Sequence, residues 1–267
     1  MWDIQLIAAV LAVSAAAGFL AGLLGIGGGM VMVPVTLWVL HAQGLDSPHT
    51  QHIAIGTSFL VMVFTAFSSA LAQHRKQAVR WDIVRGMVPG LMMGVVTGAV
   101  LARFISAKNL QLFFIVFVTV VAIRTLRNIK PKPTRTLPSR GGMAAVGGII
   151  GVISSWVGIG GGAMSMPFMM RCNVSVREAV GTSAALGWPI AASGALGYLV
   201  AGWSVPGLPA GTLGFWYLPL AAMMAVATVT VAPFGVKVAH TLPPEKLKTA
   251  FGVLLLVIAA QMLYRWL

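Results

Sequence analysis

The chain has 267 residues, of which 58% are hydrophobic and only 9% charged, and its 18 Lys and Arg against 5 Asp and Glu give a net charge of +13. An ordinary soluble domain carries about 25% charged residues, so this composition excludes a soluble globular protein. The basic excess does not indicate nucleic-acid binding, because in a membrane protein basic residues mark the loops that stay in the cytoplasm. The single cysteine, Cys172, excludes an internal disulfide, and the histidines show no metal-binding spacing.

Ten apolar segments follow one another along the chain, and the same glycine cluster, GIGGG, interrupts them at 25–29 and again at 158–162. About 20 apolar residues cross a bilayer as a helix, so the longer segments predict an all-α integral membrane protein. The second leg of each glycine hairpin is shorter, and these hairpins either cross fully or are re-entrant. The predicted segments are 4–24, 30–42, 52–73, 81–104 and 109–126, then a basic, proline-rich linker at 128–140, then 141–157, 163–176, 177–201, 215–234 and 247–267.

The two halves of the chain, 1–127 and 141–267, repeat the same order of features, which is typical of transporters. The pentapeptide AIGTS at 54–58 corresponds to AVGTS at 179–183. If each glycine cluster is the tip of a hairpin, each half has five segments, and the odd number inverts the second half relative to the first. This arrangement places all but three of the 18 basic residues on the side of the linker, whereas a single crossing at each cluster places 11 there. We therefore predict two inverted five-segment repeats forming one transport domain, with a cytoplasmic linker and both termini outside.

The glycine clusters are the first candidate site. Glycine lets backbone N–H groups approach a ligand closely, and the helix that follows each cluster begins with unpaired N–H groups and the positive end of its dipole. Such a terminus binds anions, and two inverted hairpins would aim two of them at one point. The alternative is that small residues let membrane helices pack closely. The candidate substrate-binding glycines are Gly27, Gly28, Gly29, Gly160, Gly161 and Gly162.

Hydroxyl and charged residues near these clusters extend the candidate site. Thr57, Ser58, Thr182 and Ser183 lie at matching positions of the two halves and can donate to the oxygens of an anion, unless they bond to helix carbonyls or to a neighbouring helix. His52 and Arg177 also correspond to each other. Inversion would put them at opposite mouths as possible gates, although either is as readily a satisfied loop residue.

Acidic residues are absent from the middle of every predicted segment. Proton relays and sodium sites usually recruit a carboxylate there, and an intramembrane enzyme would need a nucleophile and base or metal ligands at depth. The sequence thus predicts neither an enzyme nor a metal or cofactor site, and it lacks an ATP-binding motif. The five carboxylates are Asp3, Asp46, Asp82, Glu178 and Glu245.

Two GIGGG hairpins, each with a proline five residues later (Pro34 and Pro167) and each followed by AIGTS or AVGTS, resemble the TauE/SafE family of membrane transporters, the sulfite and organosulfonate exporters. The resemblance covers nearly the whole chain. It implies a secondary transporter of a bacterial-type cytoplasmic (inner) membrane that exports sulfite or an organosulfonate such as sulfoacetate by alternating access, without a cofactor. It also implies that the candidate glycines, threonines and serines line the pathway. An anion channel, or a transporter of another small organic anion, is the alternative.

Overall fold

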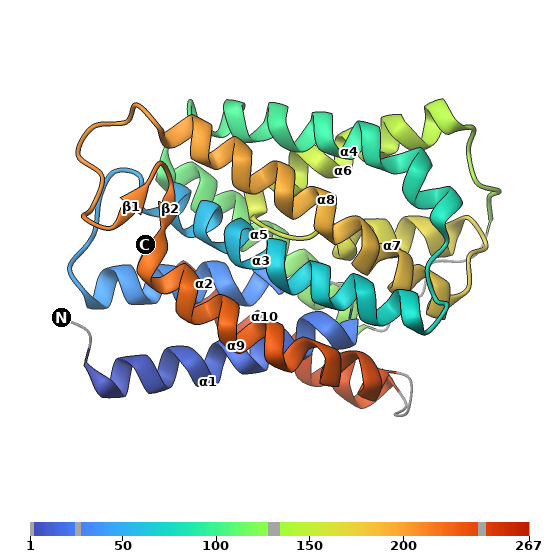
Figure 1. The fold of residues 1–267 in the computed structure, drawn as a ribbon, viewed down its shortest axis with the longest axis horizontal. Helices are drawn as coiled ribbons and strands as arrows, with labels where there is room; N and C mark the ends of the chain where they lie inside the picture. The colour runs from blue at the N-terminus through green and yellow to red at the C-terminus, as the bar shows by residue number, and fades with distance from the viewer. Residues whose placement is uncertain (1–2, 25–27, 128–133, 240–243, 267) are drawn as a thin grey trace.

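The computed structural model describes residues 3–24, 28–127, 134–239 and 244–266. Over these ranges it contains ten α-helices and one small β-hairpin (Figure 1). Eight of the helices are long and apolar enough to cross a membrane, which confirms the predicted all-α membrane fold. The elements are α1 (Ile4–Leu24), α2 (Gly29–Ala42), α3 (Thr50–Arg75), α4 (Trp81–Ala102), α5 (Ala107–Leu126), α6 (Arg140–Val157), α7 (Gly162–Arg171), α8 (Val176–Gly202), β1 (Thr212–Leu213), β2 (Trp216–Tyr217), α9 (Leu218–Ala239) and α10 (Pro244–Trp266).

The helices α2 and α7 are the second legs of the two glycine hairpins, and they are too short to span a bilayer. They have 14 and 10 residues, or about 21 and 15 Å at 1.5 Å per residue, against about 30 Å of hydrocarbon. Their glycine N-termini therefore lie inside the bundle.

Several boundaries differ from the sequence prediction by two or more residues. The segment expected to start a helix at residue 215 instead forms a β-hairpin, in which Thr212 pairs with Tyr217, and α9 begins at Leu218. The helix α7 ends at Arg171, because Asn173 takes a left-handed conformation and Ser175 caps α8 by accepting from the Glu178 N–H. The helix α3 begins at Thr50, two residues earlier than predicted.

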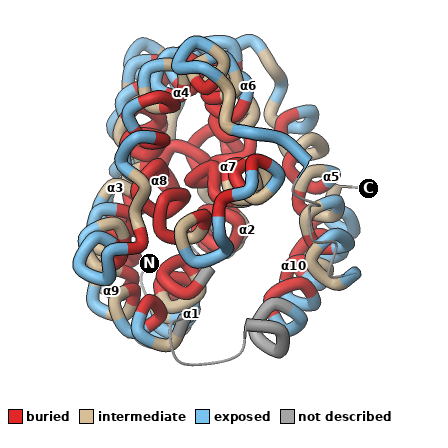
Figure 2. Tube along the Cα trace, turned by 90° about the vertical axis from the view of Figure 1, so that its right-hand side faces the viewer, coloured by how far each residue is buried: buried red, intermediate tan, exposed pale blue. Residues whose placement is uncertain are grey.

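The main helix contacts join the two halves of the chain. The helix α1 packs on α9, α4 on α6, α3 on α8, and α5 on α10. This set of pairs is unchanged when each helix of the first half is exchanged for its counterpart in the second half. Figure 2 shows buried stretches of α2, α7 and α8 in the middle of the bundle, and α3 and α8 are the most buried of the long helices.

The two ends of the bundle carry different parts of the chain. The start of α1, the end of α10 and the β-hairpin lie at one end, and linker residues 134–139 lie at the other (Figure 1). We call these the hairpin end and the linker end. At the linker end, the N–H groups of Thr134 and Arg135 donate to the carbonyl of Arg171, which ties the linker to the end of α7.

Glycines bring α4 and α6 into backbone contact. A Cβ placed on Gly90 would clash with the carbonyl oxygen of Ala144, and one placed on Gly151 would lie 2.5 Å from that of Leu91. Small residues allow such close approach in a membrane, where van der Waals contact between helices replaces the hydrophobic effect as the driving force. A Cβ on Gly148, by contrast, would lie 3.7 Å from the Gly90 carbonyl oxygen, at ordinary contact distance.

We expect Gly90→Ala to lower the melting temperature of the purified protein by several degrees, although alanine is the better helix former by about 1 kcal/mol. The added methyl group forces the α4 and α6 backbones apart. Gly148→Ala is the matched control and should melt at or above the wild-type temperature. Equal melting of the two variants in detergent would contradict backbone contact at Gly90.

Candidate functional site

The two glycine clusters adopt matching backbone conformations. Gly28, before α2, has φ 77° and ψ −8°, and Gly161, before α7, has φ 71° and ψ −12°. Both occupy the fourth position of GIGGG and lie in the left-handed region that glycine adopts without strain. Gly158 also has a positive φ, 74°, and ends α6. In both halves, therefore, a glycine with left-handed backbone directly precedes the short helix.

The two hairpin tips contact each other inside the bundle. A Cβ placed on Gly29 would clash with the carbonyl oxygen of Gly158 and lie 3.0 Å from the Ile159 Cα. Gly160 reaches α8, where a Cβ on Gly187 would lie 3.6 Å from its carbonyl oxygen. The structure therefore places Gly29 of the first cluster against Gly158 of the second, four residues before Gly162, while Gly27 lies outside the described residues.

Each tip presents the N-terminus of a short helix. The first backbone hydrogen bonds of α2 run from Val31 and Met32 to the Gly28 carbonyl, and those of α7 from Met164 and Ser165 to the Gly161 carbonyl. The N–H groups just before these residues have no carbonyl to bond within their own helix. Together with the positive end of each helix dipole, they favour a negatively charged ligand.

The GTS threonines are bound to chain segments of the opposite half. The Thr57 hydroxyl, on α3, accepts a 2.9 Å hydrogen bond from the backbone N–H of Tyr217, just before α9. The Thr182 hydroxyl, on α8, accepts an equal bond from the N–H of Arg80, which caps α4. Each threonine therefore holds the start of a helix in the other half, and its acceptor site is already in use.

Gly56 and Gly181, the residues before the two threonines, pack against the same segments of the opposite half. A Cβ on Gly56 would lie 2.5 Å from the carbonyl oxygen of Phe215, and one on Gly181 would lie 2.4 Å from that of Ala78, so neither position has room for a side chain. Phe215 and Ala78 each lie two residues before the N–H that the adjacent threonine accepts. The Gly–Thr pairs thus form two equivalent docking points, one at each end of the bundle.

The GTS serines differ from the threonines. Ser58 is fully buried, and its Oγ has no hydrogen-bond partner among the described residues. The Ser183 Oγ donates to the carbonyl of Val180 at 2.9 Å. Ser58 shares a helix face with Ile55, whose side chain lies against Gly158. Of these two serines, Ser58 therefore lies on the face toward the tips with an unused hydroxyl.

The proposed gates occupy opposite ends of the bundle but differ in burial. His52 is buried at the hairpin end, where its Nε2 is 2.9 Å from the Ala102 carbonyl oxygen and its ring packs on Phe215. Arg177 is exposed at the linker end and donates to the carbonyl of Lys76 at 2.9 Å. Each side chain bonds to a backbone carbonyl of a neighbouring helix end.

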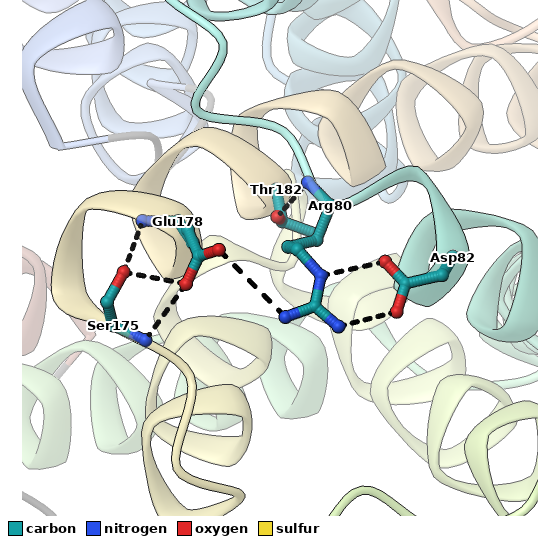
Figure 3. A network of polar contacts seen from close by, with 5 residues as sticks. All are labelled: Arg80, Asp82, Ser175, Glu178 and Thr182. Atoms are coloured by element: carbon teal, nitrogen blue, oxygen red, sulfur yellow. Dashed lines mark hydrogen bonds and ion pairs between the residues drawn. The ribbon is translucent and has the colours of Figure 1, made fainter.

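Polar side chains close the linker end around Arg80 (Figure 3). The Arg80 guanidinium makes a paired contact with Asp82, at 2.9 and 2.6 Å, and lies 3.9 Å from Glu178. Glu178 and Ser175 form a capping box at the start of α8. These side chains are partly exposed, so each ion pair contributes about 1 kcal/mol or less, and their role is to orient the loop that carries the Arg80 N–H.

At the hairpin end, Tyr217 occupies the position that Arg80 occupies at the linker end, since each donates its backbone N–H to a GTS threonine. Its hydroxyl donates to the Gln43 Oε1 at 2.8 Å, and burial raises the pKa of this phenol, so it stays protonated. Sequence reasoning missed Tyr217 and Arg80 because neither lies in a motif. The signal was their common position just before the fourth helix of each half.

The described carboxylates stay away from the tips. The side chains of Asp46, Asp82 and Glu178 are 55%, 58% and 37% exposed and lie at helix ends or in loops. In the part of the chain that the structure describes, no three His, Cys, Asp or Glu residues come together as a metal site would require.

Long apolar helices around two short helices with glycine N-termini define a multi-pass α-helical membrane protein. A family model described as "Sulfite exporter TauE/SafE" matches residues 10–262, and the chain belongs to this family. It is a membrane transporter and not an enzyme.

The similar curated proteins are also described as membrane transporters. A "probable membrane transporter protein" of Haemophilus influenzae is 34% identical over 94% of this chain and 96% of its own length. "Probable membrane transporter protein YunE" of Bacillus subtilis is 27% identical over 70% and 76%, and "probable membrane transporter protein MJ0441" of Methanocaldococcus jannaschii 25% identical over 92% and 91%. No solved structure matches the chain.

We expect Thr57→Val and Thr182→Val to destabilise the protein, because each leaves a backbone N–H without its acceptor, at a cost of about 1–3 kcal/mol. Thr57→Val should have the larger effect, since its hydrogen bond is buried and that of Thr182 is partly buried. Thermal unfolding of the purified variants measures this. Thr57→Ser and Thr182→Ser keep the hydroxyl and serve as controls; full stability of both valine variants would show that the hydroxyls do not hold the opposite half.

Proposed function

We propose that this transporter exports a small oxyanion, sulfite or an organosulfonate such as sulfoacetate, by alternating access. The observation that carries the proposal is the contact between the two glycine clusters inside the bundle, where Gly29 at the N-terminus of α2 lies against Gly158, four residues before α7 begins. An oxyanion that enters a membrane protein loses its water, and hydrogen bonds to its charged oxygens, worth roughly 1.5–3 kcal/mol each, have to replace it. Backbone N–H groups supply these bonds without a buried arginine, and the ligand can leave again. The printed name of the matching family supports this substrate class.

Inversion of the two halves fits this mechanism. The helix pairs that join the halves are unchanged when the halves are exchanged, and the Gly–Thr docking points lie at opposite ends. Both observations support an inverted repeat, with the tips near the middle of the bilayer. Rocking of one half against the other would then open the tips to each side in turn.

The membrane potential is a sufficient driving force for export. A cytoplasm-negative potential favours anion exit by about 2.3 kcal/mol per charge per 100 mV. The exposed carboxylates at helix ends give no support to a proton or sodium site at depth. We infer potential-driven export across the inner membrane, with the linker end in the cytoplasm and both termini outside.

Flux of [³⁵S]sulfite in proteoliposomes tests the proposal. A potential imposed without a pH gradient should drive sulfite movement that saturates and shows counterflow, as a carrier does and a channel does not. Gly28→Val and Gly161→Val should abolish it while the protein still inserts, since a side chain blocks approach of the backbone to the ligand. Wild-type rates in folded glycine variants, or strict dependence on a pH gradient, would contradict the mechanism.

Cysteine labelling tests the orientation separately. In a Cys172→Ser background, Ser47→Cys and Ala210→Cys at the hairpin end should react with an impermeant maleimide added outside intact cells. Thr134→Cys at the linker end should react only after the membrane is permeabilised. External labelling at residue 134 would reverse the orientation.

A further inference from the structure

The two glycine tips have different side chains around them, although their backbones match. Four residues before each GIGGG the first half has Ala21 and the second has Ser154. Three residues after it the first half has Met32 and the second has Ser165. The second tip therefore carries a hydroxyl on each leg, about one helical turn away, where the first tip is apolar.

Ser154 points at the turn that starts α7. Its Oγ lies 3.5 Å from the position that a Cβ on Gly161 would occupy, and Ile150, one turn earlier on α6, lies at the same distance. The side chain is fully buried, and its Oγ bonds to nothing in the described ranges. The counterpart contact in the first half joins Ala21 Cβ to the Cβ position of Gly28, at 3.2 Å.

Ser165 lies on the other leg of the second tip, in the first turn of α7. It is fully buried on the inward face of α7, together with Gly162 and Met169. Its backbone N–H donates to the Gly161 carbonyl at 2.8 Å, whereas its Oγ has no partner within the described structure.

Unpaired hydroxyls at this position are unusual for a helix in an apolar setting. A buried hydroxyl without a hydrogen bond costs free energy, and serines and threonines in membrane helices ordinarily bond back to a carbonyl one turn earlier. The neighbouring Ser155 does so, to Val152 at 2.7 Å, and Thr36 on α2 does so, to Met32 at 2.9 Å. Other buried serines also lack partners, but Ser154 contacts the glycine turn and Ser165 belongs to the helix that it starts.

We propose that the oxyanion binds at the second tip, where the Ser154 and Ser165 hydroxyls and the first N–H groups of α7 donate to its oxygens. The first tip has apolar groups at the matching positions, with Ala21 and the Met32 methyl 3.2 and 2.9 Å from the Cβ position of Gly28. A sulfonate would place its oxygens at α7 and its carbon substituent toward α2. This inference rests on the proposed transport of an oxyanion and assigns its hydroxyl donors to Ser154 and Ser165, in preference to the threonines that hold the opposite half.

Equilibrium binding of [³⁵S]sulfite to the purified protein tests the assignment, with sulfoacetate, thiosulfate, sulfate and lactate as competitors. Ser154→Ala and Ser165→Ala should each raise the Kd about 10-fold or more, because each removes one hydrogen bond to a charged group. Their melting temperatures without anion should equal or exceed that of the wild type, and stabilisation by added sulfite should shrink in parallel with the lost affinity.

Ser14→Ala is the matched control. Ser14 is also a fully buried serine whose Oγ has no partner among the described residues, but it lies on α1 about 16 Å along the helix from the first cluster. Its removal should leave the Kd within twofold of wild type. Sulfite binding that is unchanged in Ser154→Ala and Ser165→Ala, or weakened equally in Ser14→Ala, would overturn the assignment and leave the proposed transport intact.

The panel of anions also distinguishes failure of the sulfite proposal from failure of the hydroxyl assignment. If the wild type binds another oxyanion of the panel but not sulfite, and the two serine variants weaken that binding, the hydroxyl assignment holds and the sulfite proposal fails. If the wild type binds none of the five anions, both fail.

Discussion

Backbone-to-backbone contact between the glycine tips is the constraint on which the rest of the structure depends. A chain that breaks its helices inside a membrane must satisfy or shield the exposed peptide groups within protein, since lipid cannot. Here the break before α2 packs directly on the break after α6, through Gly29 and the Gly158 carbonyl. The contact needs a residue without a Cβ at position 29, and at position 158 the positive φ of 74° favours glycine as well. It also places the N-terminus of α2 beside the glycine cluster that leads into α7.

The Gly–Thr docking points serve a different purpose from the tips. They hold the start of α9 to α3 and the start of α4 to α8, one at each end of the bundle. Glycine has no side chain to block the approaching segment. The threonine hydroxyl accepts a hydrogen bond from a backbone N–H that has no partner at the start of the helix. A polar motif at each end of the bundle thus joins the two halves, and transport would have to move them about these points without breaking both hydrogen bonds at once.

The sequence predicted the long helices, the short second legs and the glycine tips, because hydrophobic length and GIGGG spacing are local signals. It did not predict the partners of Thr57 and Thr182, since those lie more than 100 residues away along the chain and only the packing of the halves brings them close. The β-hairpin at Thr212–Tyr217 was missed for a similar reason, as two-residue strands leave no periodic pattern. The difference between Ser154 and Ala21 is visible in the sequence. Only the structure shows that the Ser154 hydroxyl is buried without a partner among the described residues, which makes it a candidate ligand.

The exchange of contacts between halves has a consequence for biosynthesis. The helix α4 packs on α6, and α1 packs on α9, which leaves the ribosome nearly 200 residues later. The backbone N–H of Arg80 likewise has no acceptor until α8, which carries Thr182, has been synthesised. During translation the first five helices therefore stand in the bilayer with glycine faces and a helix start that have no partner yet. Final packing of the bundle therefore has to follow the insertion of the second half. A chain truncated at the linker would insert helices whose packing partners are missing.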